Sequence, residues 1–242
     1  MSVNKPIVNA GQKYINGLKL AFASTTTITV AAGAARNSTN VNDITLASAV
    51  TIDAAVTGLN GLDTGALANN TFYAVHLIGD STSNNASGAM LSTSATAPNL
   101  PYGYDMFRRI GYVLTSGAAA ILDFVQIGES SDRWMWYDVA IQELNAGASA
   151  AYASVDCATS VPAGAKMINF KATVTPTAPA DAASLRPLGA TGADGFCRLS
   201  GAVAAVAQLG QLVVPCSAAS VVEYKVVGTL SLHTQAYLDL LA

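Results

Sequence analysis

The chain has 242 residues, enough for one large domain or two small ones, and we expect two. Charged residues make up only 11% of it, against about 25% in an ordinary soluble domain. The hydrophobic fraction is 51%, but the chain has 45 alanines, whose side chains bury little area. A net charge of -3 argues against nucleic-acid binding, and the apolar content argues against disorder.

Few residues are suited to metal or redox chemistry. The only histidines are His76 and His233, and Cys157, Cys197 and Cys216 lie far apart without a Cys-x-x-Cys motif. A zinc site needs ligands at closer spacing, and a disulfide framework needs more cysteines. We therefore expect no metal and no cofactor. We expect the cysteines to be reduced and to act as small hydrophobic residues.

The chain shows no targeting or membrane signal. Residues 1–10 lack an apolar run of signal-peptide length, which predicts synthesis in the cytoplasm. The longest apolar stretch without charges, between Arg198 and Glu223, is interrupted by glutamine, proline, serine and glycine. We therefore expect no membrane insertion.

Short runs rich in Val, Ile, Thr and aromatic residues alternate with Gly, Asn, Ser and Pro clusters, which predicts an all-β protein. The expected strands, in chain order, span residues 25–31, 43–51, 71–78, 107–115, 121–127, 134–140, 151–157, 165–174, 196–199, 212–214 and 221–231. The segment between Asp80 and Asp105 has no charge, and we expect a long exposed loop or an inter-subunit contact there.

The turn-like segment 128–133 suggests the domain boundary. We expect a β-rich module over residues 1–130 and a β-sandwich, jelly-roll-like domain over residues 131–242.

Three patterns could carry chemistry, and each has a simpler structural interpretation. Ser81 follows a strand in a Gly-Asp-Ser turn, as in one class of serine esterase with His233 as base, but the other motifs of that class are missing. The acidic pairs Asp53 with Asp63 and Glu129 with Asp132 would suit a depolymerase, yet they occupy turn-like positions. The glycine-rich segment 187–195 lacks a P-loop lysine. We expect no catalytic residue.

Two pairs of neighbouring residues are the candidates for an interface. Trp134 and Trp136 share one face of an expected strand, with Met135 on the other. They suit the core or a subunit contact better than the alternative, a platform on which a sugar stacks. Arg108 and Arg109 would point to opposite faces, so we expect one to be buried against a carboxylate and the other solvated.

Several segments resemble tailed-bacteriophage virion proteins of the tail-fibre and head-fibre type. In the amino-terminal half these are residues 14–20, 25–30, 32–38, 42–44, 72–78, 90–94 (Met-Leu-Ser-Thr-Ser), 97–101 (Ala-Pro-Asn-Leu-Pro), 103–104 (Gly-Tyr) and 108–111 (Arg-Arg-Ile-Gly). In the carboxyl-terminal half, residues 161–164 and 222–225 are similar to the β-sandwich tips of such proteins.

This resemblance implies a non-enzymatic structural protein of the virion, made in the host cytoplasm and assembled onto the particle. It implies a homotrimer, and the scarcity of charge also suits close packing between identical chains. The expected function is a short tail fibre or spike that contacts other virion proteins and a host-surface glycan or protein. A capsid-decoration or head-fibre protein is the main alternative, and an esterase or depolymerase is the remote one.

Overall fold

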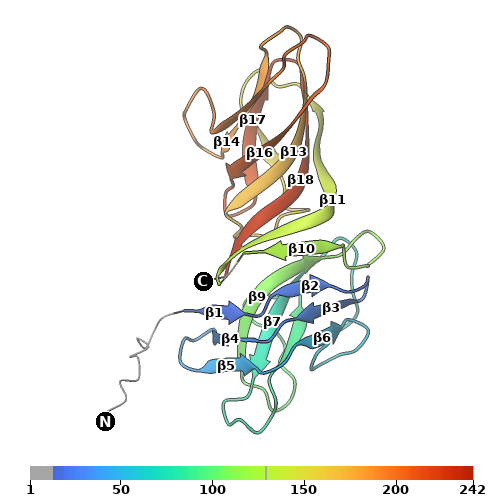
Figure 1. Cartoon of the computed structure of the whole chain (residues 1–242), viewed down its shortest axis with the longest axis vertical. Coiled ribbons are helices and arrows are strands. Elements are labelled where there is room, and N and C mark those ends of the chain that lie inside the picture. The colour runs from blue at the N-terminus through green and yellow to red at the C-terminus, as the bar shows by residue number, and fades with distance from the viewer. Residues whose placement is uncertain (1–12, 129, 242) are drawn as a thin grey trace, which may run out of the picture. The chain divides into compact units, whose positions relative to one another are not determined.

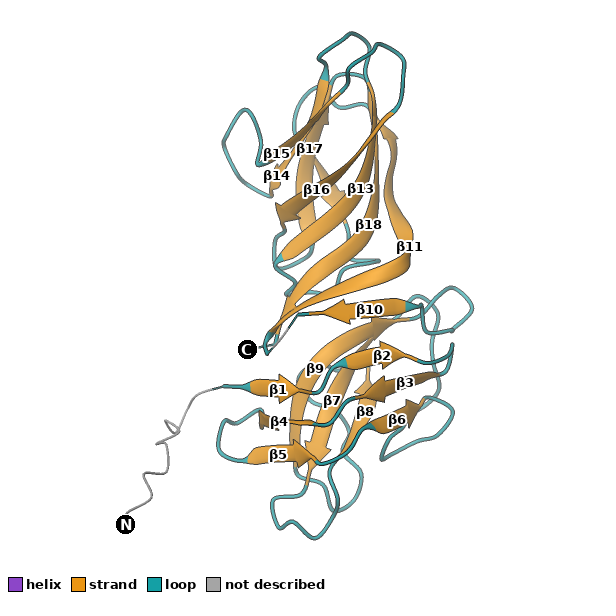
Figure 2. Ribbon diagram, viewed as in Figure 1, coloured by secondary structure: helices purple, strands orange, loops and turns teal. Residues whose placement is uncertain are grey.

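The computed structural model describes residues 13–128 and 130–241, and this part of the chain contains strands and loops but no helix (Figure 2). The all-β prediction is confirmed. The described residues form two compact units: unit 1 holds residues 13–121, 130, 131 and 241, and unit 2 holds residues 122–128 and 132–240. Residues 122–128, which we had expected in the first domain, belong to unit 2 because their strand pairs with the one that follows.

Unit 1 contains nine strands in three small antiparallel sheets (Figure 1). The strands are β1 (Ile15–Gly17), β2 (Leu20–Phe22), β3 (Thr27–Val30), β4 (Gly33–Arg36), β5 (Asp43–Leu46), β6 (Val50–Asp53), β7 (Phe72–Gly79), β8 (Gly88–Ser92) and β9 (Met106–Leu114). Their orders are β1-β4-β5, β2-β3-β6 and β8-β7-β9.

The third sheet is the centre of unit 1. In β7, every residue from Tyr73 to Gly79 is buried, and all of β8 is buried as well. The expectation of an exposed loop between Asp80 and Asp105 is therefore wrong for Gly88–Ser92. A strand covered on both faces shows no alternation of polar and apolar residues, so its small side chains gave no periodic signal.

Unit 2 contains the other nine strands in two antiparallel sheets. The strands are β10 (Phe124–Ile127), β11 (Asp132–Gly147), β12 (Ala153–Asp156), β13 (Met167–Thr175), β14 (Ala182–Pro187), β15 (Cys197–Ser200), β16 (Gln208–Pro215), β17 (Val221–Val226) and β18 (Thr229–Leu240). The larger sheet has the order β16-β13-β18-β11-β10 and the smaller one β12-β17-β14-β15.

The two sheets of unit 2 form a β-sandwich-like fold (Figure 2). Side chains alternate between buried and outward-facing positions along β13, β17 and β18, as expected for sheets with one face on a core. Phe170 and Leu232 from the larger sheet and Leu185 and Val222 from the smaller one are fully buried. The predicted sandwich is thus present at the level of two packed sheets.

Glycine and short polar segments divide runs that we had expected to be single strands. The run 43–51 is split between β5 and β6, and the run 221–231 is split at Gly228 between β17 and β18. Gly228 has a φ of 100°, a conformation that favours glycine, and a Cβ there would lie 2.2 Å from the carbonyl oxygen of Thr175.

Replacing Gly228 with alanine should therefore destabilise unit 2. We expect Gly228→Ala to lower the free energy of unfolding by about 1–3 kcal/mol, because the residue is strained and its Cβ meets backbone. Urea unfolding followed by tryptophan fluorescence measures this directly, since both tryptophans lie in unit 2. The control is Gly192→Ala, where nothing lies within 4 Å of the added Cβ. Equal midpoints for the two variants would contradict the described turn.

Candidate functional site

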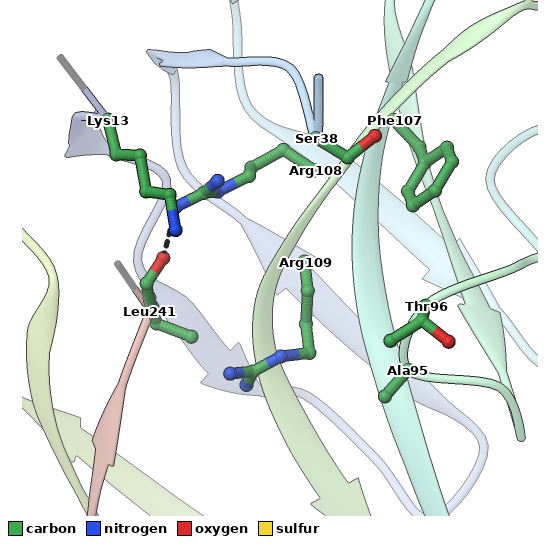
Figure 3. A pocket seen from close by; sticks show the side chains of 8 residues that line it. All are labelled: Lys13, Ser38, Ala95, Thr96, Phe107, Arg108, Arg109 and Leu241. Atoms are coloured by element: carbon green, nitrogen blue, oxygen red, sulfur yellow. Dashed lines mark hydrogen bonds between the residues drawn. The ribbon is translucent and has the colours of Figure 1, made fainter. Parts of the chain in front are cut away.

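A cavity of about 330 Å³ lies in unit 1 at the edge strand β9 (Figure 3). We call it the cationic cavity, and its lining residues are Lys13, Ser38, Ala95, Thr96, Phe107, Arg108, Arg109 and Leu241. Three of these side chains are cationic, and none of the described lining residues is acidic. Its volume is at the lower end of the range of about 300–1,000 Å³ typical of small-molecule sites.

Both arginines reach the cavity although they are consecutive in β9. Neighbouring residues of a strand point to opposite faces, but β9 is the edge strand of its sheet, so a cavity at that edge is accessible from both faces. Arg108 is 7% exposed, and its Nη2 donates a hydrogen bond to the carbonyl oxygen of Leu241. Arg109 is half-buried, and the Cζ of its guanidinium lies 4.6 Å from the centroid of the Tyr112 ring.

Three positively charged side chains lie close together in the cavity. Burial lowers the pKa of the Arg108 guanidinium, and the neighbouring Arg109 charge lowers it further. Figure 3 shows the charged ends of Lys13, Arg108 and Arg109 directed toward the part of the cavity near Leu241. A concave surface lined by one sign of charge concentrates its electrostatic potential.

A buried histidine supports the wall of the cavity that is formed by Phe107, Ala95 and Thr96. His76, fully buried on β7, is paired in register with Arg109, and its ring meets Phe107 edge-to-face at 5.5 Å. Its Nε2 donates to the carbonyl oxygen of Ser94 at 2.9 Å, which holds the loop that carries Ala95 and Thr96. Burial lowers the pKa of His76 to about 4, so the imidazole is neutral at pH 7.

A second surface lies on the outer face of the larger sheet of unit 2. The strand registers align two rows of residues across five strands, and we call these rows the tryptophan face. The first row is Ile127, Trp134, Leu238, Met167 and Pro215, and the second is Val125, Trp136, Ala236, Asn169 and Val213.

The exposed part of the tryptophan face is apolar and lies on β10 and β11, whereas Ala236 and Asn169 in its second row are buried. Val125 and Ile127 are 58% and 53% exposed, and the rings of the half-buried Trp134 and Trp136 are 6.4 Å apart. Asp132 and Asp138 precede and follow the tryptophans on β11, and Lys171 lies further along β13. An apolar patch bordered by charged residues is characteristic of protein–protein interfaces.

The four candidate interface residues thus fall on two separate surfaces. Trp134 and Trp136 point outward together, whereas Met135 is 2% exposed on the core side, as the alternation predicts. One arginine of the pair, Arg108, is buried as expected, and among the described residues its hydrogen bond goes to the backbone carbonyl of Leu241. The sequence could not place Lys13 and Leu241 beside these arginines, because they lie at opposite ends of the chain.

The serine and aspartate side chains considered as catalytic candidates form hydrogen bonds with neighbouring groups in the structure. The Ser81 hydroxyl donates to the carboxylate of Asp105, while His233 belongs to the other unit. Asp63 accepts a hydrogen bond from the Ser92 hydroxyl at 2.6 Å, and Asp53 accepts one from the amide of Ala55 at 2.9 Å. Glu129 lies outside the described residues.

One carboxyl group of unit 2 is held between elements of the sandwich. Glu143 on β11 accepts hydrogen bonds from the hydroxyls of Thr159, at 3.1 Å, and Thr234 on β18, at 3.2 Å. Burial raises the pKa of this carboxyl, and these hydroxyl hydrogen bonds offset part of the effect. Its environment therefore favours the protonated form more than water does.

Metal-binding clusters are not found among the described residues: no group of three or more His, Cys, Asp or Glu side chains is placed to hold an ion. The three cysteines are free in this structure. Within residues 13–128 and 130–241, no helix is long and apolar enough to cross a membrane.

Comparisons of the chain with protein-family models, curated proteins and solved structures gave no match.

The burial of Glu143 predicts a pH-dependent effect of its replacement. A carboxyl whose pKa is raised in the folded state stabilises the fold when protonated, and this stabilisation is lost as the pH rises through the folded-state pKa. Glu143→Gln keeps an oxygen acceptor for Thr159 and Thr234 but never ionises. We expect its melting temperature relative to wild type to be higher at pH 8 than at pH 4, measured by circular dichroism. A difference that is the same at both pH values would contradict this.

Proposed function

We propose that this protein is a non-enzymatic structural component of a bacteriophage virion, a homotrimeric short tail fibre or spike. Unit 1 serves as the attachment module, and the jelly-roll-like unit 2 is exposed for contact with a host-surface glycan or protein. Two lines of support are independent of each other: the resemblance of the amino-terminal segments to such proteins, and the tryptophan face.

The tryptophan face is the observation that carries the self-association part of this proposal. Exposed aliphatic residues beside two tryptophans form the kind of surface that is favourably removed from water by another protein. A second copy is the occupant that suits it. With a net charge of only -3 and 11% charged residues, identical chains meet with little electrostatic repulsion.

The first test of the proposal is the native mass of the purified protein. Light scattering after size-exclusion chromatography should give three times the chain mass of 24.6 kDa. A stable monomer at micromolar concentration would contradict the trimer.

The contribution of the tryptophan face is tested by placing lysines at its two most exposed positions. Val125→Lys/Ile127→Lys should raise the concentration at which the oligomer dissociates by at least tenfold, because charges would have to be buried in the interface. The matched control is Val203→Lys/Val206→Lys, two valines that are 54% and 48% exposed in the loop between β15 and β16. Circular dichroism establishes that both variants are folded. Equal dissociation of the two variants would rule out this face.

The virion part of the proposal has its own measurement. Mass spectrometry of purified particles should detect the chain, and its absence from the particles would end the proposal. Antibody labelling in electron microscopy then gives the location: labelled tails support the fibre, and labelled heads replace it with a capsid-decoration or head-fibre protein.

A further inference from the structure

Polar and charged residues line the outer face of the smaller sheet of unit 2, where β14, β15 and β17 lie side by side (Figure 2). Leu185, Val222 and Tyr224 are buried on the core side, so the residues that alternate with them point outward. The strand registers align these residues in two rows, which we call the polar face: Arg198, Ser184 and Lys225 in the first, and Arg186, Glu223 and Ser154 in the second.

The loop between β14 and β15 is fixed across the polar face. The Nη1 of Arg186 donates a hydrogen bond to the carbonyl oxygen of Gly192 at 3.2 Å. The hydroxyl of Tyr152 donates to the carbonyl oxygen of Ala193 at 3.3 Å, and the ammonium of Lys225 donates to the same oxygen. The Cζ of Arg186 also lies 3.6 Å from the centroid of the Tyr152 ring. A loop held in this way needs little reorganisation when a ligand binds beside it.

A polar hollow of about 190 Å³ lies beside this loop and is lined by charged groups of both signs. Asp181 and Asp194 contribute carboxylates, and Arg198 and Lys225 contribute cations. The side chains of Asp194 and Arg198 are exposed and form no hydrogen bond or ion pair with other described residues, so both are accessible to a ligand. An anion would be repelled by the carboxylates and a cation by the basic groups. Hydroxyl groups, which both donate and accept hydrogen bonds, match this lining.

An apolar hollow, also of about 190 Å³, lies beside the same loop. Its lining includes Pro187, Ala190 and Phe196, and the last of these is 59% exposed. Arg186 lines this hollow as well, but its charge is balanced by the carboxylate of Glu223, 2.7 Å from its Nε. An exposed aromatic ring next to an apolar hollow offers a flat surface to the C–H groups of a ligand.

We propose that the polar face, with its two hollows, is a binding site for a neutral oligosaccharide. A sugar combines hydroxyl groups with an apolar ring face, which are the two chemistries that the hollows offer. Each hollow is smaller than the volume of about 300–1,000 Å³ that is typical of a whole small-molecule site, so each suits one unit of a chain. The inference rests on the proposed function in one respect, namely that unit 2 is exposed on the particle.

An array of immobilised bacterial surface oligosaccharides, probed with the labelled full chain, tests the proposal. We expect retention by neutral oligosaccharides. Isothermal titration calorimetry with the one that binds best should give an affinity that changes less than about twofold between about 20 and 300 mM salt, because the ligand carries no charge. Retention by no oligosaccharide, or only by acidic ones, would overturn the proposal. The presence of the chain in virions is decided separately by mass spectrometry of the particles.

Charge-matched variants localise the binding. Asp194→Ala/Arg198→Ala should lower the affinity for that oligosaccharide about tenfold or more, because charge-assisted hydrogen bonds to its hydroxyl groups are lost. The control is Asp138→Ala/Lys171→Ala, which removes one exposed charge of each sign from the larger sheet and should change the affinity less than about twofold. Circular dichroism establishes that both variants are folded. Equal losses in the two variants would overturn the site.

The apolar hollow is tested at its aromatic ring. Phe196→Ala should lower the affinity about fivefold or more, because apolar contact with the sugar is lost, whereas Phe196→Tyr keeps the ring and should retain binding. Tyr102→Ala removes an exposed aromatic ring from unit 1 and serves as the control. If Phe196→Ala binds as tightly as the Tyr102→Ala control, the proposed site is wrong.

Discussion

The antiparallel pairing of β11 with β18 determines which side chains of unit 2 form the core and which form its outer surface. Its register sets Trp134 opposite Leu238 and Trp136 opposite Ala236, so the tryptophans point outward in line with residues of four other strands. A slip of one residue would send both indoles into the core and expose Met135. The tryptophan face therefore exists only because this register is maintained.

In unit 1 the corresponding constraint is the burial of β7 on both faces. β8 and β9 pair in register with the two edges of β7, so the backbone hydrogen-bonding groups of this buried strand are satisfied within the sheet. Since β9 is then the edge strand, its two arginines lie where charge can still approach water. The same sheet buries His76, whose hydrogen bond to Ser94 shapes the wall of the cationic cavity.

Strands made of β-branched and aromatic residues were predictable from the sequence, whereas strands made of small residues were not. Residues 72–79 and 167–175 agree closely with expectation, because Val, Ile, Phe and Tyr favour pleated, packed surfaces. β4, β8 and β14 are rich in Gly, Ala and Ser, and only tertiary burial makes them strands. That both tryptophans share one face followed from alternation, but that this face is the outer one did not. The cavity depends on Lys13 and Leu241, which no local pattern connects.

Charged residues are scarce in this chain, which bears on how its surfaces pack. The chain has only 12 lysines and arginines in 242 residues. A surface with so few charges suits packing against identical chains. The tryptophan face belongs to unit 2 and the cationic cavity to unit 1, so the variants that test the tryptophan face leave the cavity unchanged.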